Sequence, residues 1–131
     1  MHLIIDGHGG DPAKLGDPEI VLGLLRRLPS IMGMTVLREA EVIHYNGGDR
    51  PDAHGVTGSV IIAESHLTVH TFPDYRFAAF DASSCKDFDP AFVTGEVIEA
   101  FSLNPAWSHS RVIQRDLDLL LNRSMPEAVH G

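Results

Sequence analysis

Three strand-like runs follow one another in the middle of this chain, and the links between them are very short. The runs cover residues 57–63, 66–72 and 76–84, and they contain many β-branched and aromatic residues. Such short links join antiparallel neighbours, because a parallel connection needs a crossover of about a dozen residues or more. The middle of the chain therefore predicts a sheet of antiparallel strands.

Two helices are expected on either side of this block. Asp17-Pro18 and Asp89-Pro90 each combine a side-chain acceptor at the N-cap with a proline at the first helical position. Apolar residues at helical spacing follow both pairs. We expect Pro29 to end the first of these helices, because proline lacks the backbone N–H that a helix interior uses.

Further strands are expected at residues 2–6, 34–45 and 108–115. The resulting order, β-α-β-β-β-β-α-β, predicts an α+β two-layer sandwich, in which two helices cover one face of a mainly antiparallel sheet. The 131 residues are enough for one domain, spanning 1–131. The uncovered face or an edge of the sheet then needs a partner, so we expect a homodimer.

Composition excludes several classes of function. The net charge of −8 argues against a nucleic-acid partner, whose phosphates require a basic surface. No apolar run approaches the roughly 18 residues of a membrane span, and the first residues do not resemble a signal peptide. The single cysteine, Cys85, excludes an internal disulfide and fits a cytoplasmic location.

The Glu64-Ser65 peptide bond lies between two of the central strands, with His66 and His70 shortly after it. A serine here can be an ordinary turn residue. Alternatively, its hydroxyl can attack the carbonyl of Glu64 and convert the amide to an ester. A histidine base can then remove the α-proton of Ser65, expel Glu64 as a carboxylate and leave dehydroalanine, which hydrolyses to a pyruvoyl group.

A covalent pyruvoyl group is a built-in carbonyl. It can form a Schiff base with a substrate amine and accept electrons as carbon dioxide leaves. The α-carbon must afterwards be protonated. Cys85 is a candidate donor, because a thiol with a pKa of about 8.5 is mostly protonated at neutral pH.

Three segments carry a resemblance to a known family: Gly55-Val-Thr-Gly58, Glu64-Ser-His-Leu-Thr-Val-His-Thr-Phe-Pro73 and Ala82-Ser-Ser-Cys85. They resemble the self-cleaving, pyruvoyl-dependent S-adenosylmethionine decarboxylases of bacteria and archaea. The likeness is strong from about Gly55 to Pro90 and extends loosely over the element order of residues 1–115.

The resemblance implies a proenzyme that cleaves itself into residues 1–64 and 65–131. In it Ser65 becomes the pyruvoyl group, His70 is the processing base and Cys85 is the catalytic proton donor. Thr57 falls where the family has a serine that assists processing, and its hydroxyl can make similar hydrogen bonds. The product would be the aminopropyl donor for spermidine synthesis.

The chain departs from the family where substrate is recognised. Phe72 replaces a tryptophan, Asp6 replaces a glutamate, and the loop before Gly55 is long and rich in Gly and Asp. Tyr45, at the base of that loop, is the aromatic candidate to stack on adenine. Two alternatives stay open: the substrate is ornithine or arginine, or the chain is an unprocessed regulatory paralogue.

No metal site is expected from the sequence. His66 and His70 lie four residues apart, and on a strand this separates them by about 13 Å. That distance is too long for a shared ion, so the pair does not predict zinc. For His66 we expect a structural role or a contact with the Glu64 carboxylate.

Overall fold

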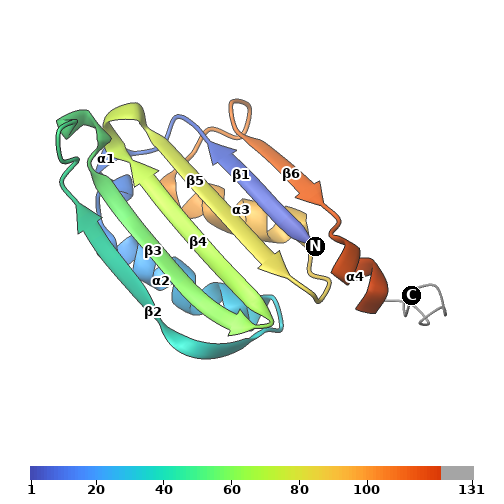
Figure 1. The fold of residues 1–131 in the computed structure, drawn as a ribbon. Helices are drawn as coiled ribbons and strands as arrows, with labels where there is room; N and C mark the ends of the chain where they lie inside the picture. Colours follow the sequence, from blue (N-terminus) through green and yellow to red (C-terminus); the bar gives the residue numbers. More distant parts are fainter. Residues whose placement is uncertain (122–131) are drawn as a thin grey trace.

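The computed structural model describes residues 1–121, in which six strands form one sheet and two longer helices lie behind it (Figure 1). The elements, in chain order, are β1 (His2–Gly7), α1 (Pro12–Leu15), α2 (Pro18–Ile31), β2 (Thr35–Tyr45), the 3-10 helix η1 (Pro51–Ala53), β3 (Gly55–Ala63), β4 (Ser65–Phe72), the 3-10 helix η2 (Pro73–Tyr75), β5 (Phe77–Ser84), α3 (Pro90–Phe101), β6 (His109–Ile113) and α4 (Asp116–Leu121).

The strands lie in the order β2-β3-β4-β5-β1-β6, and every neighbouring pair is antiparallel. The short links predicted from the sequence join β3 to β4 and β4 to β5. β1 is inserted between β5 and β6, so the first strand of the chain lies inside the sheet. β2 and β6 are the edges.

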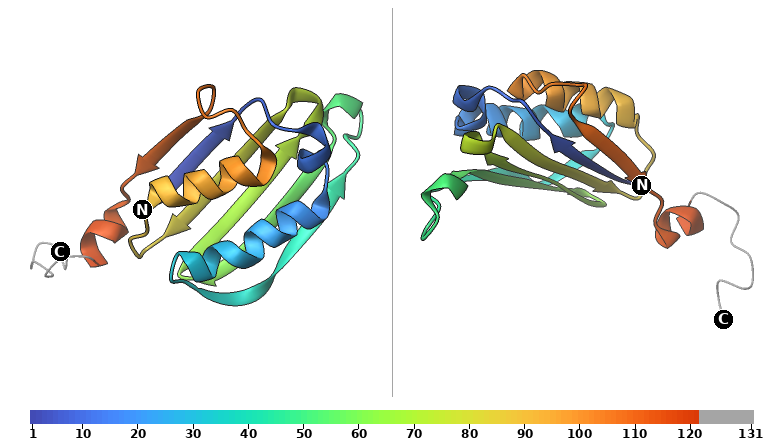
Figure 2. Two further views of the ribbon diagram at one scale, coloured as in Figure 1. Left: turned by 180° about the vertical axis from the view of Figure 1, so that it is seen from behind. Right: turned by 90° about the horizontal axis from the view of Figure 1, so that it is seen from above.

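Both long helices cover the same face of the sheet (Figure 2). The side chain of Asp17 accepts a hydrogen bond from the N–H of Glu19, and Asp89 caps α3 in the same way. The expectation that Pro29 ends the first helix was wrong, because α2 continues to Ile31. A proline in the last turn removes one hydrogen bond, and its ring is buried here against the core.

The core lies between the helices and the alternate strand residues that face them. α2 contributes Val21, Leu24, Leu25 and Leu28, all fully buried, and α3 contributes Phe101 among others. On the sheet side the buried residues follow the two-residue period of a strand, as in Leu3 and Ile5, Val60 and Ile62, Leu67 and Val69, and Phe80 and Ala82.

Among residues 1–121, no helix covers the opposite face of the sheet, which we call the open face. Its side chains belong to the other set of alternate strand residues, which includes Ile43, Tyr45, Thr57, Ser59, Ile61, His66, Thr68, His70, Phe72, Ala79, Asp81, His2 and Asp6. Several are apolar and exposed, with 64% of Ile43, 51% of Tyr45 and 47% of Ile61 accessible. A face with this much exposed apolar surface is typical of an interaction site.

The predicted fold class is confirmed: the chain is α+β, with two helices on one face of an antiparallel sheet. The short helices α1 and α4 were not expected. The closing strand is shorter than predicted, ending at Ile113. The predicted frayed tail beyond residue 121 lies outside the described residues.

Candidate active site

Ser65 is the first residue of β4 and follows the tight link that contains Glu64. The serine lies opposite Ile62 of β3 on one side and Ser84 of β5 on the other. Its Oγ is 3.3 Å from Nδ1 of His66. The predicted scissile bond is therefore at the end of the sheet, where it joins the link residue Glu64 to the first paired residue of β4.

Cys85 lies at the same end of the sheet. It directly follows Ser84, the β5 residue that is paired with Ser65, and its side chain is half-buried and free of any disulfide. The fold thus brings Cys85 to the same end of the sheet as Glu64 and Ser65, although Cys85 belongs to a separate segment of the sequence. We call this end of the sheet, which holds Glu64, Ser65 and Cys85, the cleavage end.

His70 and Thr57 form a second group. They are direct cross-strand partners, and Nδ1 of His70 is 3.2 Å from Oγ1 of Thr57. Asp6 lies in the same row across the sheet, because Ala79 is paired with both Asp6 and His70. On β4, His70 is five positions from Ser65, or roughly 16 Å at the usual rise per residue. Within one copy of the chain, His70 does not reach Ser65.

Tyr45 lies at the end of β2 beside a hollow of about 190 Å³. The lining residues are Tyr45, Ala53, Gly55, Thr57, Thr71 and Phe72. Two aromatic rings and the Thr57 hydroxyl therefore surround one hollow, next to the row of His70. This part of the surface has the apolar lining and few polar groups typical of small-molecule sites.

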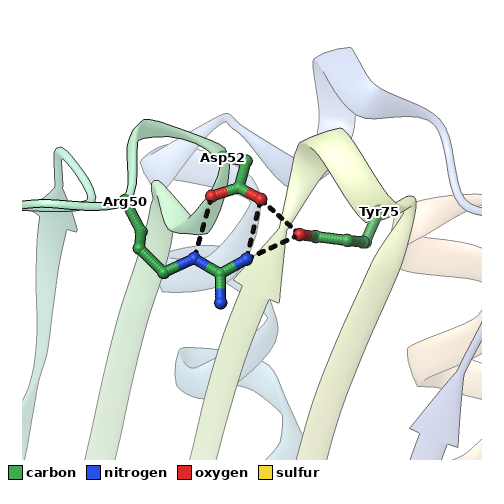
Figure 3. Close-up of polar contacts among 3 residues, drawn as sticks. All are labelled: Arg50, Asp52 and Tyr75. Atoms are coloured by element: carbon green, nitrogen blue, oxygen red, sulfur yellow. Dashed lines mark hydrogen bonds and ion pairs between the residues drawn. The ribbon is translucent and has the colours of Figure 1, made fainter.

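A polar clamp holds the long loop before Gly55 in place (Figure 3). The guanidinium of Arg50 forms a two-pronged contact with the carboxylate of Asp52, through Nε at 3.3 Å and Nη2 at 2.9 Å. The hydroxyl of Tyr75 donates to the same carboxylate and is 3.2 Å from Nη2 of Arg50. A second contact joins Nε2 of His54 to Asp74 at 3.0 Å. η1 and η2 are thereby fixed to one another beside the hollow.

The clamp changes the acidity of its members. Hydrogen bonds from Arg50 and Tyr75, and the charge of Arg50, lower the pKa of the Asp52 carboxyl. The hydrogen bond to Asp52, with desolvation and the charge of that carboxylate, raises the pKa of the Tyr75 hydroxyl. Both shifts favour the pairing of an ionised carboxylate with a protonated phenol.

Sequence reasoning missed a polar cluster on the open face beside Ser65. Asp81, on β5, receives a hydrogen bond from Thr68 at 2.7 Å through Oδ2. Its Oδ1 lies 3.3 Å from Nε2 of His66 and 3.5 Å from Nε2 of His2. These residues come from three strands, so no local motif reveals them. Only the register of β1, β4 and β5 would have done so.

The described residues were compared with the requirements of a metal site and of a membrane-spanning helix. Within residues 1–121, no group of three or more His, Cys, Asp or Glu side chains is arranged to hold a metal ion. Over the same span, no helix is long and apolar enough to cross a membrane.

Comparison with known proteins identifies the family. Residues 1–116 match the family model described as S-adenosylmethionine decarboxylase. This chain belongs to that family. One similar member is the S-adenosylmethionine decarboxylase proenzyme of Anoxybacillus flavithermus, which is 46% identical over 99 residues, covering 76% of this chain and 74% of the relative.

A second relative and a solved structure are also similar to this chain. The arginine decarboxylase proenzyme of Ignicoccus hospitalis is 34% identical over 86 residues, covering 64% of this chain and 55% of the relative. The crystal structure of the adenosylmethionine decarboxylase from Aquifex aeolicus aligns with a TM-score of 0.68 at 21% identity, over 88% of this chain and 92% of that one. The latter likeness confirms the fold.

Proposed function

We propose that the chain is a self-processing decarboxylase that cuts its own Glu64-Ser65 bond and converts Ser65 to a pyruvoyl group. The observation that carries the proposal is the position of Ser65, at a strand start beside the link, with its hydroxyl next to an imidazole nitrogen and Cys85 at the same end of the sheet. A hydroxyl beside a base is the arrangement that activates a serine. The residues therefore fit a serine-derived pyruvoyl group.

A pyruvoyl group supplies an electrophilic carbonyl that condenses with a substrate amine and withdraws electrons as carbon dioxide leaves. The chain must then deliver a proton to the substrate carbon. Cys85 is our candidate for that delivery, because it lies at the cleavage end and a thiol is mostly protonated at neutral pH. The half-buried position of Cys85 also limits competition from bulk water.

We infer that the mature enzyme acts as a homodimer of processed protomers. The roughly 16 Å between Ser65 and His70 separates the proposed nucleophile from the proposed base within one copy. His70 lies on the open face, which exposes Ile43, Tyr45 and Ile61, whereas Ser65 lies at the end of the sheet. Two copies that pack open face to open face in opposite directions would bring His70 and Thr57 of one copy towards the cleavage end of the other, and would bury the apolar surface.

S-adenosylmethionine is the substrate that we propose, which would make the product the aminopropyl donor for spermidine synthesis in the cytoplasm. The relatives named for this activity support the choice, and the hollow between Tyr45 and Phe72 offers aromatic surfaces for an adenine ring. Asp6, in the row of His70, is a candidate contact for the cationic end of the substrate. A relative named arginine decarboxylase proenzyme supports an amino-acid substrate as the second candidate.

Denaturing mass spectrometry of the purified protein tests the proposal. We expect two chains, residues 1–64 and 65–131, with the second carrying a pyruvoyl group in place of its first serine. Ser65→Ala should remain one chain. A wild-type protein that also remains one chain would contradict self-cleavage and would favour the regulatory paralogue.

The substrate is decided by a separate measurement. Release of carbon dioxide is compared for S-adenosylmethionine, ornithine and arginine with the same processed protein. We expect turnover of S-adenosylmethionine. Turnover of arginine or ornithine in its place would transfer the proposal to the second candidate without affecting the proposed self-cleavage.

A further inference from the structure

The polar cluster beside Ser65 continues as a chain of three groups. From the Oγ of Ser65 it is 3.3 Å to Nδ1 of His66, and from Nε2 of the same ring it is 3.3 Å to Oδ1 of Asp81. The imidazole therefore lies between a hydroxyl and a carboxylate, with one ring nitrogen facing each. This is the order of groups in which a carboxylate orients a histidine that serves as base to a serine.

The carboxylate determines which nitrogen of His66 carries the proton. An ionised carboxylate cannot donate a hydrogen bond, so the carboxylate of Asp81, 3.3 Å from Nε2 of His66, favours a proton on that ring nitrogen. In a neutral imidazole the proton is then on Nε2, and Nδ1 keeps its lone pair. That lone pair faces the Ser65 hydroxyl, which can donate its hydrogen to it.

Asp81 is itself held from two other directions. Thr68 donates to its second oxygen at 2.7 Å, which fixes the plane of the carboxylate. Nε2 of His2 is buried, 3.5 Å from the same oxygen that faces His66, and makes no hydrogen bond within the described part of the chain. The carboxylate is only one-third exposed, and four strand residues from β1, β4 and β5 thus converge on one point beside the scissile link.

We propose that His66 is the proton acceptor for Ser65 in the first step of self-cleavage and that Asp81 is the residue that positions it. This inference rests on the proposed function. In the step, Oγ of Ser65 forms a bond to the carbonyl carbon of Glu64 while its proton moves to Nδ1 of His66. The bond between that carbon and the Ser65 nitrogen breaks, and His66 returns the proton to the nitrogen, leaving an ester and a free amine.

The assignment divides the two processing steps between two histidines. His70 faces Thr57, roughly 16 Å along the strand from Ser65, and can act only from a second copy. His66 is in place within its own copy. We therefore assign the formation of the ester to His66, and leave the later removal of the Ser65 α-proton to His70.

The rate at which purified precursor splits tests the role of His66. We expect His66→Ala and His66→Gln to split about 10²-fold more slowly than wild type, the usual contribution of a positioned general base. Added imidazole should restore part of the rate in His66→Ala. The matched control is His44→Ala, which removes an exposed histidine from β2 and should split at the wild-type rate.

Hydroxylamine separates the two steps, because it cleaves esters under conditions that leave amides intact. In His70→Ala the ester should form, and hydroxylamine should release a second chain that begins with unmodified Ser65. In His66→Ala hydroxylamine should release almost none. Equal release of the second chain from both variants, or splitting of His66→Ala at the wild-type rate, would overturn this inference and leave the proposed function intact. A wild-type protein that never splits would contradict the proposed function itself.

Nitrogen NMR of the histidine rings tests the role of Asp81 independently of cleavage. In the uncut Ser65→Ala precursor, His66 should be the tautomer with its proton on Nε2. Asp81→Asn should change this tautomer, because an amide can donate to Nε2, and should slow splitting in the Ser65 protein as strongly as His66→Ala. An unchanged tautomer and unchanged splitting would refute the positioning role.

Discussion

At the scale of single residues, the Thr71 hydroxyl joins three parts of the fold. It is 2% exposed, donates to the carbonyl of Leu15 at 2.6 Å and accepts from the N–H of Val56 at 2.9 Å. One side chain of β4 thereby satisfies the end of α1 and a backbone group of β3. Thr71 also lines the hollow beside Tyr45, so its hydrogen bonds fix part of the candidate substrate site.

Replacing Thr71 with valine keeps the shape of the side chain and removes these bonds. We expect a loss of about 1–3 kcal/mol in the free energy of unfolding, because two buried backbone groups lose their partner. Urea unfolding of the Ser65→Ala protein, which remains one chain, provides the measurement. The control Thr35→Val changes an exposed threonine and should shift stability by less than about 0.5 kcal/mol; equal losses would contradict this account.

At the scale of elements, the clamp between η1 and η2 should work only over a limited pH range. The lowered pKa of Asp52 means that its contribution to stability is complete above its unfolded pKa and is lost as the pH falls through the folded value. The raised pKa of Tyr75 means that its contribution is complete below the unfolded pKa and is lost as the pH rises through the folded value. The loop is therefore held at neutral pH and released at both extremes.

The ionisation of Tyr75 can be followed by ultraviolet absorbance. In a Tyr45→Phe background Tyr75 is the sole remaining tyrosine. It should titrate above the ordinary value of about 10. Asp52→Asn should bring the titration back towards that value, because it removes the carboxylate that accepts the phenol's hydrogen bond. A titration that Asp52→Asn leaves unchanged would show that the clamp does not form in solution.

Much of this element-level arrangement could be predicted from the sequence. Strand periodicity, short links and the Asp-Pro helix starts led to the correct order of the six strands and the two long helices, because each is a local signal. The clamp, the hollow and the separation of His70 from Ser65 could not be predicted, since each depends on the register of strands that are distant in the chain. Gly55 illustrates the difference: a Cβ there would lie 1.8 Å from the carbonyl oxygen of Thr71, a contact that only the paired strands create.

At the scale of the whole molecule, the proposed cut divides the sheet in an unusual way. Residues 1–64 supply β1, β2 and β3, and residues 65–131 supply β4, β5 and β6. In the sheet order β2-β3-β4-β5-β1-β6, β1 of the first chain lies between β5 and β6 of the second. The two chains should therefore elute together in native gel filtration and separate only in denaturant. Separation under native conditions would contradict this.

The inserted strand β1 also has a consequence for how the protein is made. Before cleavage, the sheet assembles within one molecule, and the rate of that reaction does not depend on concentration. After cleavage, the same sheet can be rebuilt only by an encounter of two separate chains. Refolding of the cut protein should therefore slow on dilution, whereas the initial folding of Ser65→Ala should not. A protein that matures in this way can fold as a single chain only before the cleavage that makes it active.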